Sequence, residues 1–300
     1  NIYFIIIIGI ILFEYCLSFV VRTLNLSALD PSVPNEFTDI LDKDKYIESQ
    51  KYTKENARFS YFTSTFSLFV GFVFIFGIPA FGINPIYNEV DLFARMYDFN
   101  NVITGLLFYA LLTFITDIIN LPFGLYSTFV IEEKYGFNKT TLKTFFTDKI
   151  KGYFLMLIIG FPLIALILYC FEEFSYAWLY AWLIMILFSL IIQPLYNSFI
   201  APMFNKFTPL EEGELLNKIK IYLDKINFPV KKLEVMDGSK RSSHSNAYFS
   251  GWGKNKRIAL FDTLIDQMDD DEILSVIAHE VGHYKLKHVH IGIVLSSIQT

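Results

Sequence analysis

Long apolar stretches, separated by polar segments, occupy most of residues 1–200 of this 300-residue chain. A helix needs about 20 predominantly apolar residues to cross the hydrocarbon core of a bilayer. Five stretches qualify, at residues 2–21, 61–83, 102–131, 153–171 and 176–200, and a sixth begins at Val289. The third is long and contains Asp117 and Pro122, so we expect it either to be kinked or to end and continue beyond the bilayer. The pattern predicts a mainly α, multi-spanning membrane protein.

Residues 201–288 have a different pattern. The segment is more polar, and its apolar positions recur at short and varied intervals, which is typical of a small soluble domain. Helical periodicity runs over residues 210–227 and ends before Pro229. Short strands are expected at 231–236, 246–251 and 256–261. A second helix is expected at 269–288, because aspartates at its start and basic residues at its end complement the helix dipole. The sequence predicts a small α+β domain here, followed by the start of the sixth span at 289–300.

The basic residues are distributed unevenly between the polar segments. Residues 22–60 hold six Lys and Arg, residues 132–152 hold five, and residues 201–288 hold thirteen. If the spans simply alternate, 24 of the 25 basic residues fall on one face, which the positive-inside rule assigns to the cytosol. The predicted organisation is a transmembrane region at 1–200 with two basic cytosolic loops (22–60 and 132–152) and a cytosolic domain at 201–288.

The composition supports a membrane protein. Hydrophobic residues make up 53% of the chain and charged residues 18%, whereas soluble domains hold about a quarter charged residues. Cys16 and Cys170 both lie in apolar runs, so they do not form a disulfide framework. Glu14 and Asp117 lie within predicted spans, where a carboxylate either has a function or faces a water-filled interior. We expect the protein to contact membrane lipid and not to bind nucleic acid.

The chemistry is concentrated in the sequence H-E-V-G-H at residues 279–283. On a helix, His279 and His283 project from one face about a turn apart, so both imidazoles reach one Zn²⁺ ion. Glu280 then lies beside the metal and can accept a proton from the water bound there. We expect small Gly282 to let another element approach closely. The alternative is two surface histidines on an ordinary amphipathic helix.

The other histidines do not complete the site in this prediction. His288 falls half a turn round the helix from His279, and His290 falls too far along its axis to ligate. His244 lies in a Ser-rich turn and is expected to be solvated. A catalytic zinc needs three protein ligands and one open position, so we expect the third ligand beyond residue 300. The chain is accordingly expected to be an N-terminal fragment of a longer protein.

Several segments together resemble one known family, the type I CAAX prenyl endopeptidases, which are integral-membrane zinc metalloproteases. They read E-E-K-Y-G-F-N-K-T-T at 132–141, A-P-M-F-N-K-F-T-P-L at 201–210, G-S-K-R-S-S-H-S-N-A-Y at 238–248 and N-K-R-I-A-L-F-D-T-L at 255–264. The resemblance covers essentially the whole chain. It implies seven spans around an intramembrane chamber, a metalloprotease domain on the cytosolic side, and location in the endoplasmic reticulum or inner nuclear membrane.

The resemblance also implies an activity and residue roles. The family removes the C-terminal tripeptide from farnesylated CAAX proteins. His279 and His283 correspond to its zinc ligands, Glu280 to its general base, and a glutamate beyond residue 300 to its third ligand. Asn246, Ala247 and Tyr248 resemble its substrate-binding edge, where a strand can hold an extended peptide by main-chain hydrogen bonds. Without the resemblance, these three residues read as a loop-to-strand junction, and Lys240 and Arg241 as solvated residues of a basic turn.

Three other functions fit parts of the pattern. A quality-control membrane metalloprotease would have the same zinc helix but would cut unprenylated proteins equally well. In an intramembrane protease of the site-two type the helix would lie within the bilayer, which the charges at residues 269–271 and 285–288 disfavour. A non-catalytic scaffold or channel that keeps the zinc helix would have no use for Glu280.

Overall fold

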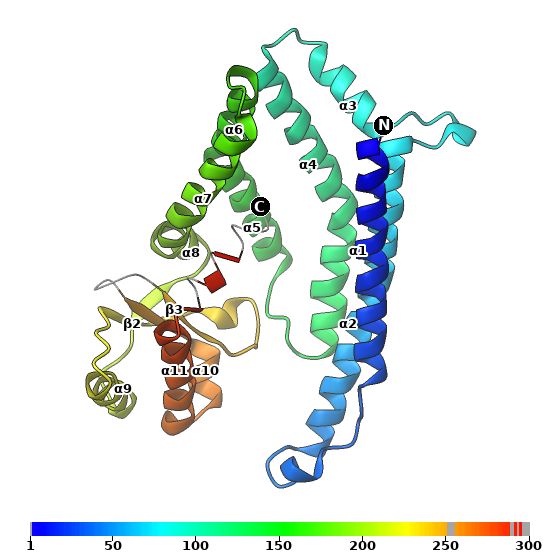
Figure 1. Ribbon diagram of the computed structural model, residues 1–300. Coiled ribbons are helices and arrows are strands. Elements are labelled where there is room, and N and C mark those ends of the chain that lie inside the picture. Colours follow the sequence, from blue (N-terminus) through cyan, green and yellow to red (C-terminus); the bar gives the residue numbers. More distant parts are fainter. Residues whose placement is uncertain (1, 251–255, 289–290, 293, 296–300) are drawn as a thin grey trace. The chain divides into compact units, whose positions relative to one another are not determined.

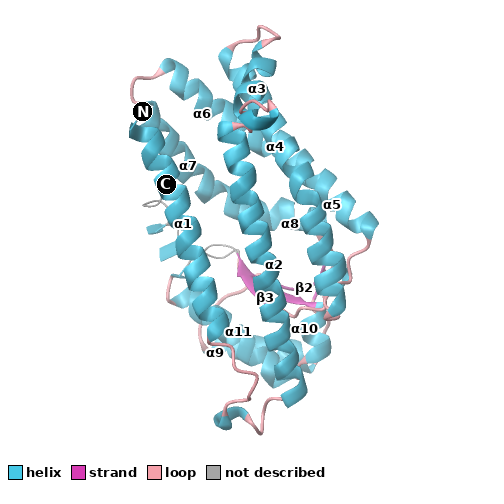
Figure 2. Ribbon diagram, turned by 90° about the vertical axis from the view of Figure 1, so that its right-hand side faces the viewer, coloured by secondary structure: helices cyan, strands magenta, loops and turns pink. Residues whose placement is uncertain are grey.

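The structure, a computed structural model, describes residues 2–250, 256–288, 291–292 and 294–295. It forms two compact units, Asn1–Tyr135 and Gly136–Thr300, which divide within the predicted basic loop at 132–152. Helices make up most of the described chain, and strands β1–β4 gather in one small sheet of the second unit (Figure 2). This confirms the predicted fold class, a mainly α membrane protein with a small α+β part. The domain boundaries at 200 and 288 stay a prediction.

The first unit is built from helices, of which three are long and one, α3, is short (Figure 1). They are α1 (Ile2–Ser27), α2 (Lys43–Phe76), α3 (Ile86–Arg95) and α4 (Asn101–Tyr126), with short 3-10 turns η1 (Asn35–Phe37) and η2 (Pro79–Phe81) and a π-helical turn η3 (Ser127–Glu132). Helices α1 and α2 lie side by side, and the Tyr15 hydroxyl is 2.8 Å from Thr65 Oγ1 between them. The third span passes Pro122 and continues through η3 as one helical segment, Asn101–Glu132, so the expected kink stays a prediction.

Four helices of the described chain are long and apolar enough to cross a membrane, or five if one bent pair counts as a single span. The bent pair is Ala177–Ile192 with Tyr196–Phe204, and its two parts meet at 43°. Pro194 lies at the bend, since its ring blocks regular helical hydrogen bonding. All five predicted spans therefore correspond to helices, the fifth one broken. The expected start of the sixth, Val289, lies outside the described residues.

The second predicted span ends earlier than expected. Helix α2 ends at Phe76, seven residues before the end of the apolar run, because Gly77 adopts φ = 66°. A Cβ at Gly77 would lie 2.2 Å from the Ile83 carbonyl oxygen, so the chain turns back on itself in a way that only glycine permits. Hydrophobicity alone did not reveal this turn.

The second unit combines two membrane-type helical segments with the small sheet. The helical segments are α5 (Leu142–Leu155), η4 (Met156–Gly160) and α6 (Phe161–Glu173), then α7 (Ala177–Leu195), η5 (Tyr196–Ile200) and α8 (Ala201–Phe204). The sheet region contains β1 (Phe207–Pro209), α9 (Glu214–Lys225), β2 (Lys232–Met236), η6 (Gly238–Lys240), β3 (Ala247–Ser250), β4 (Arg257–Phe261), α10 (Asp262–Gln267) and α11 (Asp270–Lys285). The three predicted strands and two predicted helices are present, whereas β1 and α10 were not predicted.

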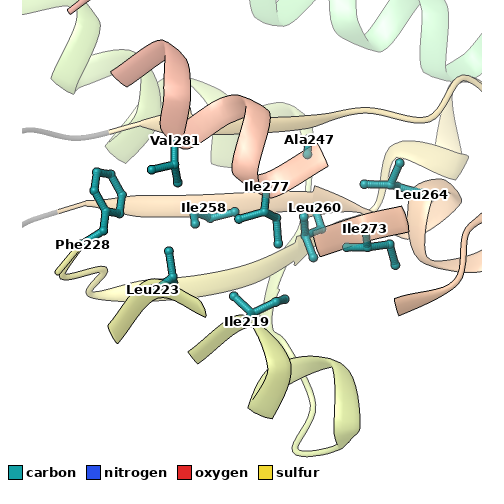
Figure 3. Packing of buried hydrophobic residues seen from close by; sticks show 10 residues of the cluster. All are labelled: Ile219, Leu223, Phe228, Ala247, Ile258, Leu260, Leu264, Ile273, Ile277 and Val281. Atoms are coloured by element: carbon teal, nitrogen blue, oxygen red, sulfur yellow. The ribbon is translucent and has the colours of Figure 1, made fainter. Parts of the chain in front are cut away.

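The strand order is β1-β2-β4-β3, with β2 and β4 parallel and the other two pairs antiparallel. One hydrophobic core joins this sheet to helices α9 and α11 (Figure 3). Ile273, Ile277 and Val281 of α11 are 0–1% exposed and pack with Ile258 and Leu260 of β4. The spacing of the three α11 residues is that of one helix face, which fixes the helix against the sheet and leaves its other face to carry the motif.

Candidate metal centre

Helix α11 begins with a capping box. The Asp269 carboxylate accepts the backbone N–H groups of Asp271 and Glu272, both at 2.9 Å, and the Glu272 carboxylate accepts the Asp269 N–H at 3.0 Å. These contacts satisfy N–H groups that have no partner inside a helix. The cap and the buried face together hold the motif in a defined orientation.

The imidazole rings of the two motif histidines lie next to each other on one face of α11. The Nε2 atoms of His279 and His283 are 2.9 Å apart, and both side chains are exposed. Two nitrogens at ~2.0–2.1 Å from a tetrahedral zinc ion lie roughly 3.3 Å apart. A separation wider by a few tenths of an ångström would therefore admit the ion, and the pair fits a metal.

Glu280 follows His279 and is partly buried. Its carboxylate forms no hydrogen bond or ion pair in the part of the chain that the structure describes, which leaves the group available for a proton. Gly282 does not have the expected role, because a Cβ there would meet no neighbouring atom within 4 Å among the described residues.

His288 does not lie where a continuous helix would put it. Its Nδ1 atom is 2.7 Å from Nδ1 of His283. Helix α11 ends at Lys285, and Lys287 adopts φ = 58°, so the chain reverses and brings His288 back to the motif face. The prediction that His288 lies on the opposite face is wrong, because it extended the helix three residues too far.

The contact with His288 can orient a metal ligand. If His283 carries its proton on Nδ1 and donates it to His288, its Nε2 lone pair points at the metal position. Ligating histidines in metalloproteins usually donate the other ring N–H in this way. We expect His288→Ala to weaken metal affinity about 10–100-fold, the range typical of losing such a partner. Competition with a chelator measures this, and an unchanged affinity would show that the contact has no such role.

Fewer than three His, Cys, Asp or Glu side chains converge on any metal-sized site in the described residues. The two histidines of α11 are close enough to share a metal ion, and their role as ligands, like the third ligand, stays a prediction.

Two rings and a lysine fix the end of α11 next to His283. Tyr284 packs against Phe228 and Phe249, with ring centroids 5.1 and 4.8 Å away. The Lys256 ammonium lies 3.8 Å from the Phe228 ring centre and 4.5 Å from that of Tyr284. Burial, and secondly the charge of Lys285, lowers the pKa of Lys256. This cluster holds the C-terminal turn of the helix in place.

Strand β3 carries the predicted substrate-binding residues. It pairs with β4 alone among the described strands and so forms an edge of the sheet. The carbonyl of Asn246 accepts the Phe261 N–H at 3.0 Å, and its side chain accepts the Ala247 N–H at 2.8 Å. Ala247 is buried in the core, and burial raises the pKa of the Tyr248 hydroxyl. An edge strand can pair with an extended peptide. The role of Asn246, Ala247 and Tyr248 in binding a substrate stays a prediction.

Arg241 is a residue whose importance sequence reasoning on its own missed. Its guanidinium makes two bonds to Asp148 of α5, at 2.8 and 3.0 Å, and a third to the Asn205 side chain at 2.8 Å. It is therefore not the solvated side chain of a basic turn, although its neighbour Lys240 is exposed. The only sequence signal was its place in the G-S-K-R-S-S-H segment of the resemblance.

The same turn also contacts the segment at 136–140. The Lys139 N–H and the Thr140 hydroxyl both donate to the Arg241 carbonyl at 3.0 Å, and the His244 ring stacks on Phe137 with centroids 4.1 Å apart. Two of the segments that carry the resemblance therefore bind each other.

We expect Arg241→Ala to destabilise the protein by about 2 kcal/mol, because a partly buried carboxylate loses a bidentate partner. Arg241→Lys should recover only part of this, since an ammonium cannot make the forked contact. Thermal unfolding in neutral detergent measures both, with Lys240→Ala as the control for an exposed neighbour. If Arg241→Ala unfolds at the same temperature as the control, the contact between Arg241 and Asp148 contributes nothing to the stability of the protein.

Two family models match the chain. The model described as CAAX prenyl protease N-terminal, five membrane helices, matches residues 22–206, and that of peptidase family M48 matches residues 209–300. The first alone covers more than half of the chain. The chain belongs to the CAAX prenyl protease branch of peptidase family M48. The match to the N-terminal model begins near the end of α1 and contains the other membrane-type helices of the described chain.

Named relatives of this family are similar over most of the chain. The CAAX prenyl protease 1 homolog of Arabidopsis thaliana is 38% identical, over 94% of this chain and 67% of its own length. CAAX prenyl protease 1 of Saccharomyces cerevisiae is 39% identical over 90% and 61%, and the Homo sapiens homolog 34% over 89% and 64%. The chain thus spans about 61–67% of the length of these relatives.

A solved structure has the same fold. The crystal structure of S. mikatae Ste24p superimposes with a TM-score of 0.85 at 36% sequence identity, covering 97% of this chain and 67% of that one. Membership of this family of membrane metallopeptidases implies a metal cofactor, which agrees with the paired histidines of α11.

Proposed function

We propose that this chain forms the membrane region and the zinc helix of a metalloendopeptidase that removes the C-terminal tripeptide from farnesylated CAAX proteins. The observation that carries the proposal is the pair of imidazoles on capped helix α11, with Nε2 atoms 2.9 Å apart and a carboxylate next to one of them. Relatives that are named CAAX prenyl proteases at 34–39% identity support the substrate class.

In this proposal His279 and His283 hold the zinc ion, and a glutamate beyond residue 300 is the third ligand. Zinc held there would supply Lewis-acid chemistry to the attacking water and the scissile carbonyl. Glu280 accepts a proton from the attacking water and later gives one to the leaving amine. Edge strand β3, at Asn246, Ala247 and Tyr248, holds the substrate in an extended conformation.

The proposed setting is the membrane of the endoplasmic reticulum or the inner nuclear membrane. The domain at 201–288 lies on the cytosolic side, because residues 22–60, 132–152 and 201–288 hold 24 of the 25 basic residues. A cytosolic active site beside the bilayer could receive a peptide whose lipid group stays in the membrane.

The test compares two peptides that differ only in the lipid. A CAAX peptide with a farnesylated cysteine and the same peptide without it are incubated with the purified full-length protein in nanodiscs, and released tripeptide is quantified by mass spectrometry. We expect kcat/KM for the farnesylated peptide to be at least 100-fold higher, because burial of each CH₂ group contributes roughly 0.8 kcal/mol. Equal values would instead favour a quality-control protease, and no cleavage of either would favour a non-catalytic scaffold.

A further inference from the structure

A cavity of about 700 Å³ lies in the second unit, between the sheet and the end of the fifth span. Five basic residues and one carboxylate line it, namely Lys206, Lys231, Lys232, Lys256, Arg257 and Glu234. The span contributes Pro194, Asn197 and Ser198 to the wall. None of these residues belongs to the proposed peptidase machinery, so the cavity needs a separate explanation.

The single carboxylate is already neutralised. Glu234 forms an ion pair with the Arg257 guanidinium, and both side chains are 12–13% exposed. Arg257 also donates to the Asn197 carbonyl at 2.9 Å and covers the Phe207 ring at 3.8 Å. This arrangement fixes Arg257 in the wall, and the remaining lysines give the cavity a clear excess of positive charge. An anion is therefore the ligand that the cavity favours.

A buried hydroxyl in the wall lacks a partner. Ser250 is 7% exposed, and its Oγ atom makes no hydrogen bond in the part of the chain that the structure describes. It lies directly opposite Arg257 in the register of β3 and β4. A buried hydroxyl without a partner is costly, and an anionic oxygen bound in the cavity would accept its hydrogen bond.

The position of the cavity indicates the source of the anion. It adjoins the bend of the fifth span, where apolar helix α7 gives way to η5 and the polar sheet region. Basic residues just beyond a membrane span attract the phosphate groups of anionic lipids. We propose that this cavity binds the phosphate of an anionic phospholipid headgroup, with Lys206 and Lys232 supplying charge and Ser250 a hydrogen bond.

The test measures lipid binding to the purified protein in neutral detergent. Thermal unfolding is followed while dioctanoyl phosphatidic acid, dioctanoyl phosphatidylcholine or inorganic phosphate is added. We expect phosphatidic acid to raise Tm in a saturable manner, and phosphatidylcholine and inorganic phosphate to have little effect at the same concentrations. The double variant Lys206→Met/Lys232→Met should bind phosphatidic acid about 30-fold more weakly, from the usual contribution of two basic residues near an anionic headgroup.

Two further variants keep the result interpretable. Lys240→Met removes an exposed lysine that does not line the cavity, and it should bind phosphatidic acid like the wild type. Ser250→Ala removes the hydroxyl without changing the charge and should weaken binding to a smaller extent. Equal binding by the wild type and the double lysine variant would overturn the site. Equal stabilisation by inorganic phosphate would overturn the assignment to a lipid. Neither outcome depends on peptidase activity, so this proposal and the proposed function fail separately.

Discussion

Glu280→Gln should reduce kcat/KM for a farnesylated CAAX peptide by about 10²–10⁴-fold, the usual contribution of a general base or acid. The amide keeps the size of the side chain but cannot accept the proton of the attacking water. Neither histidine is altered, so the variant should keep its zinc. The measurement combines the rate of tripeptide release with zinc content from elemental analysis.

The matched control is Glu211→Gln, which makes the same chemical change at an exposed position outside α11. It should retain wild-type turnover. Near-normal cleavage by Glu280→Gln would rule out the assigned base. Loss of zinc together with activity would show that the carboxylate supports the metal rather than the proton transfer.

Replacing His279 by alanine should remove the metal itself. The site loses one of two imidazoles whose Nε2 atoms lie 2.9 Å apart, and the remaining ligands cannot complete a tetrahedral set. The loss of affinity should exceed the about 10–100-fold expected for an outer partner such as His288. Zinc measured after purification should therefore fall from one equivalent to near zero, and hydrolysis should stop.

His244→Ala provides the comparison for this variant. It also removes an imidazole from the same region, but His244 stacks on Phe137 and does not belong to the motif. It should keep a full equivalent of zinc. If His279→Ala retains zinc as well as His244→Ala does, the metal lies elsewhere in the protein.

Much of the fold could be predicted because each of its main elements is specified by one strong local feature of the sequence. Spans follow from runs of about 20 apolar residues, and β2 and β4 from short apolar stretches next to turn residues. Helix α11 was predictable because aspartates at its start and basic residues at its end complement the helix dipole, whereas its capping box and buried face are known from the structure. The histidine pair follows directly from a four-residue spacing on that helix.

The errors come from backbone turns and from long-range pairing. Nothing in the local sequence signals that Lys287 adopts a positive φ, and this one residue moves His288 from the opposite face to 2.7 Å from His283. Gly77 ends α2 within an apolar run for a similar reason. Arg241 and Asp148 are 93 residues apart, so no local pattern could reveal their ion pair. Strand β1 has only three residues and is defined by pairing with β2.

X-ray absorption at the zinc edge of the purified protein tests the central claim most directly. We expect one zinc ion with two imidazole nitrogens and additional oxygen ligands, the zinc–nitrogen distances being ~2.0–2.1 Å. The imidazole signal should disappear in the double variant His279→Ala/His283→Ala. A zinc ion bound by sulfur at ~2.3 Å, or an unchanged imidazole signal in the double variant, would contradict it.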